Sequence, residues 1–240
     1  PTFVRFNAES HRTMTVVETA SQRVRRLADK PWRAQFEHPF VTGIGDGTLP
    51  MDNFTWYLAQ DYVYLIDYAR VFGSLAARSP DLAAMKKFSE LMATMLEGEM
   101  SLHRQITADF GITPAQLEAT IKAPTNQGYT DFLIRVAATG EFAEAVSALL
   151  PCMWVYSDLG IYLQDKGLPE NPHYAQWITA YAAPEFVELT EWTKNLLDEY
   201  SANAPAAIQR RIDDAFLICT RYELAFWEMG WTKQTWLDEQ

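Results

Sequence analysis

A cysteine directly follows a proline inside an apolar, aromatic stretch of helical character, the segment 149–156 (LLPCMWVY). Because proline lacks an amide donor and clashes with the carbonyl four residues earlier, the helix is expected to bend near Ser147 or Ala148. A bend in a buried helix leaves backbone polar groups and a gap, and both help to hold a ligand. Cys152 is therefore a candidate site residue. The structural alternative is an inert buried thiol beside a tolerated kink.

Two carboxylates also lie among large apolar residues: Asp61 in the run QDYVYL and Glu223 in the run YELAFW. A carboxylate in such surroundings is costly unless it is paired or holds a ligand, and an ion pair with Arg or Lys would explain either one equally well. Tyr64 shares a helix face with Asp61, and Tyr156 lies one turn after Cys152. Together these groups indicate a pocket that binds a flat polar heterocycle by stacking and hydrogen bonding.

Helical periodicity accounts for most of the chain, and there is almost no strand signal. The segment 38–50, dense in glycine and proline, is expected to be a structured turn, and it lacks the context of a phosphate-binding loop. Thr113, Pro114 and Gln116 form a capping-box helix start. No connection is long enough to divide domains, so the sequence predicts one all-α helical bundle. The predicted helices cover residues 16–28, 51–77, 82–110, 131–138, 142–164, 174–182, 184–200 and 205–233.

Composition excludes several classes of partner. The chain has 31 acidic and 20 basic residues, a net charge of −11, and would repel phosphate backbones and anionic lipid. Nucleic acid and membrane surfaces are therefore poor candidates. Two cysteines cannot form a disulfide framework, and no leader-like segment or apolar run of ~20 residues is present. We expect a cytoplasmic protein with a single domain over residues 16–240 and an N-terminal extension over residues 1–15.

Four segments give the chain a family resemblance: 38–41 with 45–50, 60–65, 149–156, and 222–223 with 226–227. In these segments the sequence resembles the TenA family, thiaminase II or aminopyrimidine aminohydrolases, in the branch with a catalytic cysteine. The resemblance implies a haem-oxygenase-like helical fold without haem, usually assembled as a homotetramer, with no cofactor or metal. It also implies release of 4-amino-5-hydroxymethyl-2-methylpyrimidine from thiamin or its breakdown products, in thiamin salvage.

The resemblance also assigns residue roles by position. It makes Cys152 the nucleophile, Glu223 the acid/base carboxylate and Asp61 the carboxylate that binds the pyrimidine. Tyr181, which matches the last pocket tyrosine, is followed by the segment 182–184 (AAP), where the family often has glycines. Tyr129, which matches another pocket tyrosine, follows the turn-like segment 124–128. The pocket tyrosines implied by position are Tyr64, Tyr129, Tyr156 and Tyr181.

These residue types suit such a reaction. Thiolate addition to the ring carbon beside the methylene would push electrons towards that methylene and expel the leaving group, after which water adds and the thiolate departs. The route needs a soft nucleophile, a carboxylate for the amidine edge and a proton donor for the leaving group. Burial alone raises a thiol pKa, and no histidine lies in the cysteine motif. We therefore expect Tyr156 or a carboxylate, acting directly or through the substrate, to take the proton of Cys152.

A helical oxidase related to pyrroloquinoline-quinone synthase is one alternative. Metal-dependent oxidases of this kind need several histidines and carboxylates at helical spacing, but the chain has four histidines in all. Glu99 and His103 are spaced to share a metal, yet no second such pair occurs. The sequence therefore predicts no metal site.

A non-catalytic pyrimidine-binding or regulatory protein on the same fold is the other alternative. The joint presence of Cys152, Asp61 and Glu223 argues against lost catalysis. Cys219, one helical turn before Glu223, is either a small core residue or a second group facing the same cavity. The sequence does not rank thiamin against its degradation products as substrates.

Overall fold

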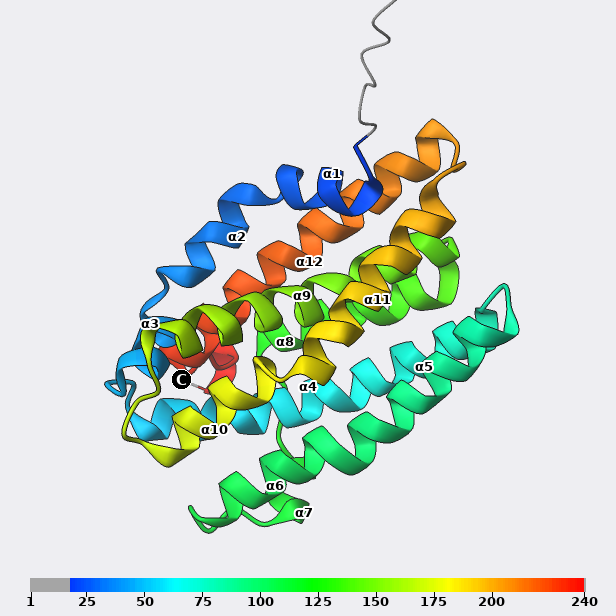
Figure 1. The fold of residues 1–240 in the computed structure, drawn as a ribbon. Coiled ribbons are helices and arrows are strands. Elements are labelled where there is room, and N and C mark those ends of the chain that lie inside the picture. The colour runs from blue at the N-terminus through cyan, green and yellow to red at the C-terminus, as the bar shows by residue number, and fades with distance from the viewer. Residues whose placement is uncertain (1–17, 240) are drawn as a thin grey trace, which may run out of the picture.

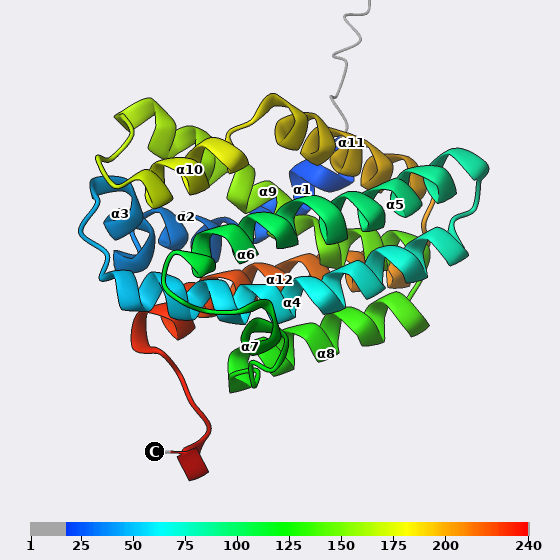
Figure 2. The same ribbon diagram turned by 90° about the horizontal axis from the view of Figure 1, so that it is seen from below.

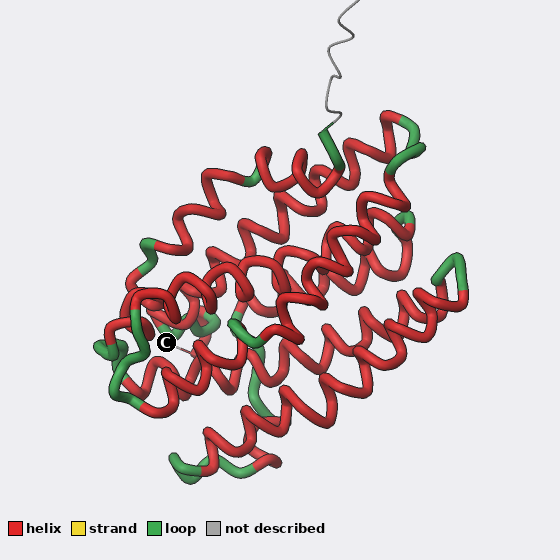
Figure 3. Tube along the Cα trace, viewed as in Figure 1, coloured by secondary structure: helices red, strands yellow, loops and turns green. Residues whose placement is uncertain are grey.

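The structure, a computed structural model, describes residues 18–239, and that part of the chain is helical with no strand (Figure 3). The predicted all-α bundle is confirmed, whereas the extension expected over residues 1–15 lies outside the described residues. A short 3-10 turn, Leu237–Glu239, follows the last helix. The helices are α1 (Ala20–Leu27), α2 (Asp29–Phe36), α3 (Pro39–Asp46), α4 (Met51–Arg78), α5 (Leu82–Thr94), a π-helical turn (Met95–Glu99), α6 (Met100–Ala108), α7 (Pro114–Glu118), α8 (Pro124–Thr139), α9 (Phe142–Lys166), α10 (Pro172–Tyr181), α11 (Pro184–Ser201) and α12 (Ala206–Thr232).

Three long helices, α4, α9 and α12, contact one another at the centre of the bundle, and the shorter helices cover them (Figures 1 and 2). Helix α9 also contacts α8, α10 and α11, so it has few faces left for solvent. In the described part of the chain, α9 alone is long and apolar enough to cross a membrane, but 72% of its apolar stretch is buried inside the protein. This burial identifies it as the core helix of the bundle.

The turn predicted over residues 38–50 is wrong in part, because residues 39–46 form helix α3. The side chain of His38 accepts a hydrogen bond from the Phe40 amide, and Pro39 occupies the first helical position, where its missing donor costs nothing. Gly47 ends the helix with a φ of 79°, a left-handed conformation that glycine adopts without strain. The glycines of this segment are therefore the reason why a short helix was predicted to be a turn.

Other predicted boundaries also change. The first predicted helix, over residues 16–28, missed α2, which follows α1 after Ala28. The turn-like segment 124–128 is the first turn of α8, with Pro124 at its start. The capping box of Thr113 and Gln116 is confirmed at α7. Helix α9 continues through Pro151.

The single helix predicted over residues 82–110 is interrupted. A π-helical turn separates α5 from α6, and at its end the Met100 amide donates to the Met95 carbonyl, five residues earlier. Such single wide turns inside α-helices occur frequently at functional sites. Here the turn ends at Glu99, one of the residues that line the cavity described next.

Candidate active site

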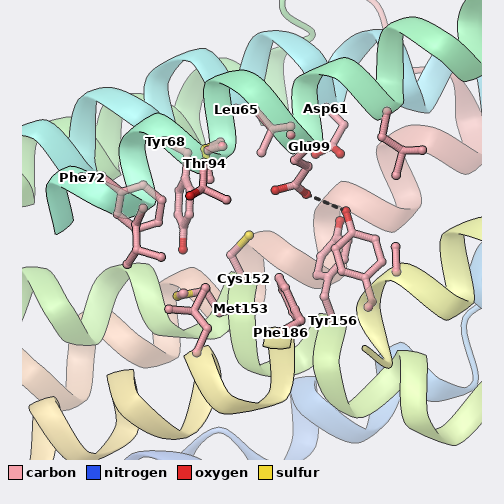
Figure 4. A pocket seen from close by; sticks show the side chains of 17 residues that line it. Asp61, Leu65, Tyr68, Phe72, Thr94, Glu99, Cys152, Met153, Tyr156 and Phe186 are labelled. Carbon is pink, nitrogen blue, oxygen red and sulfur yellow. Dashed lines mark hydrogen bonds between the residues drawn. The ribbon is translucent and has the colours of Figure 1, made fainter. Parts of the chain in front are cut away.

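A cavity of about 290 Å³ lies between α4, the α5–α6 arm with its π-helical turn, and helices α9, α10 and α11. Figure 4 shows Cys152 near its middle, with the sulfur directed into the cavity. Asp61 and Glu99 lie at one end, and Phe72 lies at the other. The side chain of Cys152 is half-buried, which leaves the thiol accessible to a bound molecule.

Two contacts fix the register of α4 against α9. The hydroxyls of Tyr57 and Tyr156 are hydrogen-bonded at 3.1 Å, and further along α4 the hydroxyl of Tyr68 donates to the Leu149 carbonyl at 2.7 Å. From the first contact to the second, the residue numbers increase on α4, from 57 to 68, and decrease on α9, from 156 to 149. The two helices are therefore antiparallel. Cys152 lies between the two contacts and is therefore level with the middle of the α4 stretch from Tyr57 to Tyr68.

Asp61 is held by a histidine. The Nε2 atom of His103 lies 2.7 Å from Asp61 Oδ2, and its Nδ1 atom donates to the Glu99 carbonyl at 2.9 Å. Burial lowers the pKa of His103, but the hydrogen bond and charge of Asp61, together with the charge of Glu99, outweigh burial and raise it overall. With both ring nitrogens donating, His103 is an imidazolium that fixes the orientation of the Asp61 carboxylate.

The second carboxylate of this end belongs to Glu99. Its Oε1 atom accepts a hydrogen bond of 2.9 Å from the Tyr181 hydroxyl, shown as the dashed line in Figure 4. Burial raises the pKa of Glu99, and the neighbouring Asp61 charge adds to the rise against the opposing effects of His103 and Tyr181. The cavity therefore has a polar end, which the carboxyl groups of Asp61 and Glu99 both line.

Glycine at position 160 allows Tyr181 to reach this end. A Cβ atom on Gly160 would lie 2.7 Å from both the Tyr181 carbonyl carbon and the Ala182 nitrogen. Real Cβ contacts are not that short, so α10 approaches α9 this closely because residue 160 has no side chain. Tyr181 lines the cavity. It does so although it is followed by alanines, at positions where the family that this sequence resembles often has glycines.

Glu223 is the third carboxylate, and it does not line the cavity. Its side chain is buried and accepts a hydrogen bond from the Tyr129 hydroxyl. Burial raises the pKa of Glu223 to about 8, with the Asp61 charge adding to the rise and the Tyr129 hydrogen bond opposing it. Glu223 is therefore protonated at neutral pH and able to donate a proton.

The thiol of Cys152 is affected by the same surroundings. Burial raises the pKa of Cys152 well above its ordinary value, and the Glu223 charge raises it further, while the nearby Tyr64 hydroxyl opposes the rise. Cys152 is thus a neutral thiol before substrate binds. Cys219 is fully buried and lies outside the cavity, and its pKa is also raised by burial.

The seven residues expected at the site thus fall into two groups. Four of them line the cavity, whereas Glu223, Tyr64 and Tyr129 form a layer next to it, in which the rings of Tyr64 and Tyr129 are 5.2 Å apart. The hydroxyl of Tyr64 is buried and has no hydrogen-bond partner among the residues that the structure describes. The four lining residues are Asp61, Cys152, Tyr156 and Tyr181.

Sequence reasoning missed the roles of Glu99, His103 and Tyr57. The spacing of Glu99 and His103 was compatible with a shared metal, although no metal site was predicted, and in the structure they bind Tyr181 and Asp61. Within residues 18–239, no group of three or more His, Cys, Asp or Glu side chains is arranged to hold a metal ion. The sequence signal that could have indicated these roles was the presence of two titratable residues, Glu99 and His103, one helical turn apart.

Comparison with known proteins identifies the family. Residues 25–233 match the model of the TENA/THI-4/PQQC family. An aminopyrimidine aminohydrolase from Halalkalibacterium halodurans is 39% identical over 208 residues, which cover 85% of this chain and 92% of that protein. The chain belongs to the TENA/THI-4/PQQC family, and the resemblance to TenA is confirmed.

Solved structures agree on the fold. A TenA homologue from P. horikoshii superposes with a TM-score of 0.83 at 27% identity, covering 89% of this chain and 99% of that one. Haem oxygenase 2 from Chlamydomonas reinhardtii superposes with a TM-score of 0.59 at 15% identity, covering 88% of this chain and 97% of that one. At that identity the second likeness concerns the fold alone, and it confirms the predicted haem-oxygenase-like architecture.

Proposed function

We propose that this chain is an aminopyrimidine aminohydrolase of the thiaminase II type, which uses Cys152 as its nucleophile. One observation carries the proposal: the Cys152 thiol projects into a cavity that Asp61, bound to His103, lines at one end, and Glu223 is buried in the layer next to this cavity. A soft nucleophile and an oriented carboxylate thus line one cavity, and a proton donor lies in the adjoining layer. The aminopyrimidine aminohydrolase from H. halodurans supports the choice of substrate class.

Asp61 binds the amidine edge of the pyrimidine. Its carboxylate accepts hydrogen bonds from the ring's amino group, and His103 keeps it oriented. Tyr156 and Tyr181 line the same part of the cavity, with ring centroids 4.8 Å apart, and form aromatic walls for a planar ring. A flat heterocycle bound here lies beside the Cys152 thiol.

The reaction then follows in two stages. The sulfur of Cys152 adds to the ring carbon next to the carbon that bears the methylene, and the thiol proton passes to the adjacent ring nitrogen. The amino-group electron pair expels the leaving group and leaves an exocyclic methylene. Water adds to the methylene carbon, the C–S bond breaks, and the proton returns to sulfur. For an aminomethyl substrate, the net change is one water consumed, with one ammonia and one pyrimidine alcohol released.

Glu223 serves as the proton donor and acceptor of this cycle. With its pKa raised to about 8, it is protonated at neutral pH and is the source of the proton that a departing amine takes up. The resulting carboxylate takes a proton back from the water that attacks the methylene. Tyr129 holds the carboxyl group in place through its hydrogen bond.

The test is to incubate the purified chain with aminomethyl aminopyrimidine and with thiamin separately, and to follow the pyrimidine alcohol by mass spectrometry. We expect release of the alcohol and, from the amine, one equivalent of ammonia. Incubation in H₂¹⁸O should place the label in the alcohol. Absence of product from both substrates, with the pyrimidine still bound, would instead favour a non-catalytic binding protein.

We also propose that the chain assembles as a homotetramer in the cytoplasm. Large apolar side chains such as Leu82, 80% exposed, and Ile121, 68% exposed, provide surface for association. Both cysteines are free thiols, as is usual in a reducing compartment. Light scattering coupled to size exclusion measures the mass, and a monomeric mass near 27.4 kDa contradicts the assembly.

A further inference from the structure

Glu99 has a carboxyl oxygen that no other side chain uses. Its backbone carbonyl accepts a hydrogen bond from His103 Nδ1 at 2.9 Å, and its Oε1 atom accepts one from the Tyr181 hydroxyl at 2.9 Å. Its Oε2 atom has no hydrogen-bond partner among the residues that the structure describes, although the side chain lines the cavity. Figure 4 shows this second oxygen directed away from the Tyr181 hydroxyl, towards the middle of the cavity where Cys152 lies. The two occupied oxygens position Glu99 and leave the third for a ligand.

Asp61 presents a second free oxygen at the same end of the cavity. His103 holds its Oδ2 atom at 2.7 Å, whereas its Oδ1 atom has no hydrogen-bond partner within residues 18–239. The Asp61 charge raises the pKa of Glu99, which is the effect expected of two carboxyl groups that lie close together. The Tyr181 hydroxyl donates its proton to Glu99, so its oxygen can only accept a hydrogen bond from a ligand. The side chains of Asp61, Glu99 and Tyr181 therefore offer acceptors to a ligand and no donor.

An amino group on an aromatic ring suits this end of the cavity, and an oxo group does not. The amino group has two N–H donors, and two separate carboxyl oxygens can each accept one of them. An oxo group at the same ring position would face the oxygens of Asp61 and Glu99 with no proton between them. A buried acceptor that is left without a donor is costly, so a ligand with an oxo group would bind more weakly.

We propose that Glu99 is a second ligand-binding carboxyl group, whose Oε2 atom accepts the N–H of the pyrimidine amino group that Asp61 leaves free. This inference rests on the proposed function and adds to it a residue that determines specificity. Glu99 thereby makes the site select a 4-aminopyrimidine against the corresponding 4-oxopyrimidine. A site that hydrogen-bonds one particular group discriminates strongly against an analogue that lacks it, because its own buried polar atoms then lose their partner.

Glutamine at position 99 would reverse the hydrogen-bonding character of the free atom. Because Tyr181 still donates to residue 99, the amide oxygen of Glu99→Gln takes the place of Oε1, and the NH₂ group takes the place of Oε2. That NH₂ group suits an oxo group and repels an amino group. Glu99→Met is a second variant of similar size, which removes the acceptor and supplies no donor. Glu97 is exposed on the same π-helical turn and does not line the cavity, so Glu97→Gln is the matched control.

The measured quantity is the Kd of the 4-oxo analogue divided by the Kd of 4-amino-5-hydroxymethyl-2-methylpyrimidine, both obtained by calorimetry. We expect a wild-type ratio of about 10² or more. Glu99→Gln should lower this ratio at least tenfold and Glu99→Met at least threefold, whereas Glu97→Gln should keep it within about twofold of the wild-type value. A general loss of binding weakens both ligands by the same factor, so the ratio isolates the contact with the amino group.

The outcomes separate this inference from the proposed function. A ratio that is unchanged in both Glu99 variants overturns the inference while the proposed function stands. A wild-type ratio near one also overturns it. Wild-type protein that binds neither pyrimidine and forms no alcohol from thiamin or aminomethyl aminopyrimidine refutes the proposed function itself.

Discussion

The imidazole Nε2 of His103 lies 2.7 Å from the Asp61 carboxylate, and both side chains are buried. A buried carboxylate is stable only when its charge is compensated, and in this site His103 supplies the compensation. The pair orients the Asp61 carboxylate, and no lysine or arginine among residues 18–239 forms a salt bridge with it. A histidine four residues after the π-helical turn thus stabilises a carboxylate within an aromatic core.

Removing the histidine should weaken both folding and substrate binding. We expect His103→Leu to lower the free energy of unfolding by about 3 kcal/mol, because it leaves a buried charge unpaired, and to raise KM for the aminopyrimidine. His103→Gln keeps a donor and should lose less of both. His173, whose Nε2 lies 3.9 Å from the exposed Asp109, provides the control variant His173→Gln. An unchanged KM in His103→Leu would refute the positioning role.

The contribution of His103 should also depend on pH. Its pKa is raised above the ordinary value of 6.5, so the folded protein binds this proton more tightly than the unfolded chain. The stabilisation is therefore fully present below pH 6.5 and is lost as the pH rises through the raised pKa. Thermal unfolding of wild type and His103→Leu should differ most near pH 6, and a difference that grows towards pH 9 contradicts the assignment.

The Asp61 carboxylate should act mainly in binding. Asp61→Asn keeps the shape of the side chain and removes its charge, so we expect KM for the aminopyrimidine to rise at least tenfold, with a smaller change in kcat. Asp67 supplies a matched control, since it is buried on the same helix, binds Arg70 and Lys122, and does not line the cavity. Asp67→Asn should alter stability and leave KM near its wild-type value. Equal KM values for the two variants would disprove the anchoring role.

The sequence was sufficient to predict the all-α bundle, because helical periodicity and capping residues are local properties. Thr113 with Gln116 marked the start of α7, as predicted. The segment 38–50 was misjudged because Gly43 and Gly45 are unfavourable in helices, yet α3 forms through packing. In that helix, a Cβ on Gly43 would lie 3.0 Å from the Leu49 backbone nitrogen, so close approach explains this glycine better than flexibility does.

The site was predictable only as a set of residue types. Cys152 and Asp61 stood out as polar groups in apolar runs, but nothing local indicated that His103 would bind Asp61, since 42 residues separate them. The π-helical turn was also invisible, because its residues differ little from those of an ordinary helix. Partner choice and helix register depend on tertiary packing, which periodicity does not encode.

The two cysteines allow a controlled test of nucleophilic catalysis. Both thiols have pKa values raised by burial, but Cys152 lines the cavity and Cys219 does not. We expect Cys152→Ser to reduce kcat/KM about 10²-fold or more, because a hydroxyl is a far weaker nucleophile towards the ring. Cys219→Ser should retain activity within a few fold. Comparable rates for Cys152→Ser and wild type would refute the nucleophile assignment.

We expect Glu223 to make catalysis depend on pH, because the proposed donor must be protonated. With a pKa of about 8, its proton is lost as the pH rises through that value, so we expect kcat/KM to fall above pH 8. Glu223→Gln should lower kcat/KM about 10²-fold and remove this alkaline decline from the residual activity. A decline that persists at the same pH in Glu223→Gln would assign it to another group.

The pH dependence of protein stability gives an independent measure of the protonation of Glu223. The folded pKa of Glu223, about 8, exceeds its ordinary value of 4.5, so between these values the folded protein binds more protons than the unfolded chain. Its effect on stability is most favourable below pH 4.5 and is lost as the pH rises through 8, because ionisation then takes place in a buried site. The Tm of Glu223→Gln relative to wild type should therefore increase from pH 6 to pH 9.

Tyr129→Phe removes the hydrogen bond that lowers the pKa of Glu223. It should therefore move the alkaline decline in activity to higher pH. A shift of this decline to lower pH would contradict the proposed pairing of Tyr129 with Glu223.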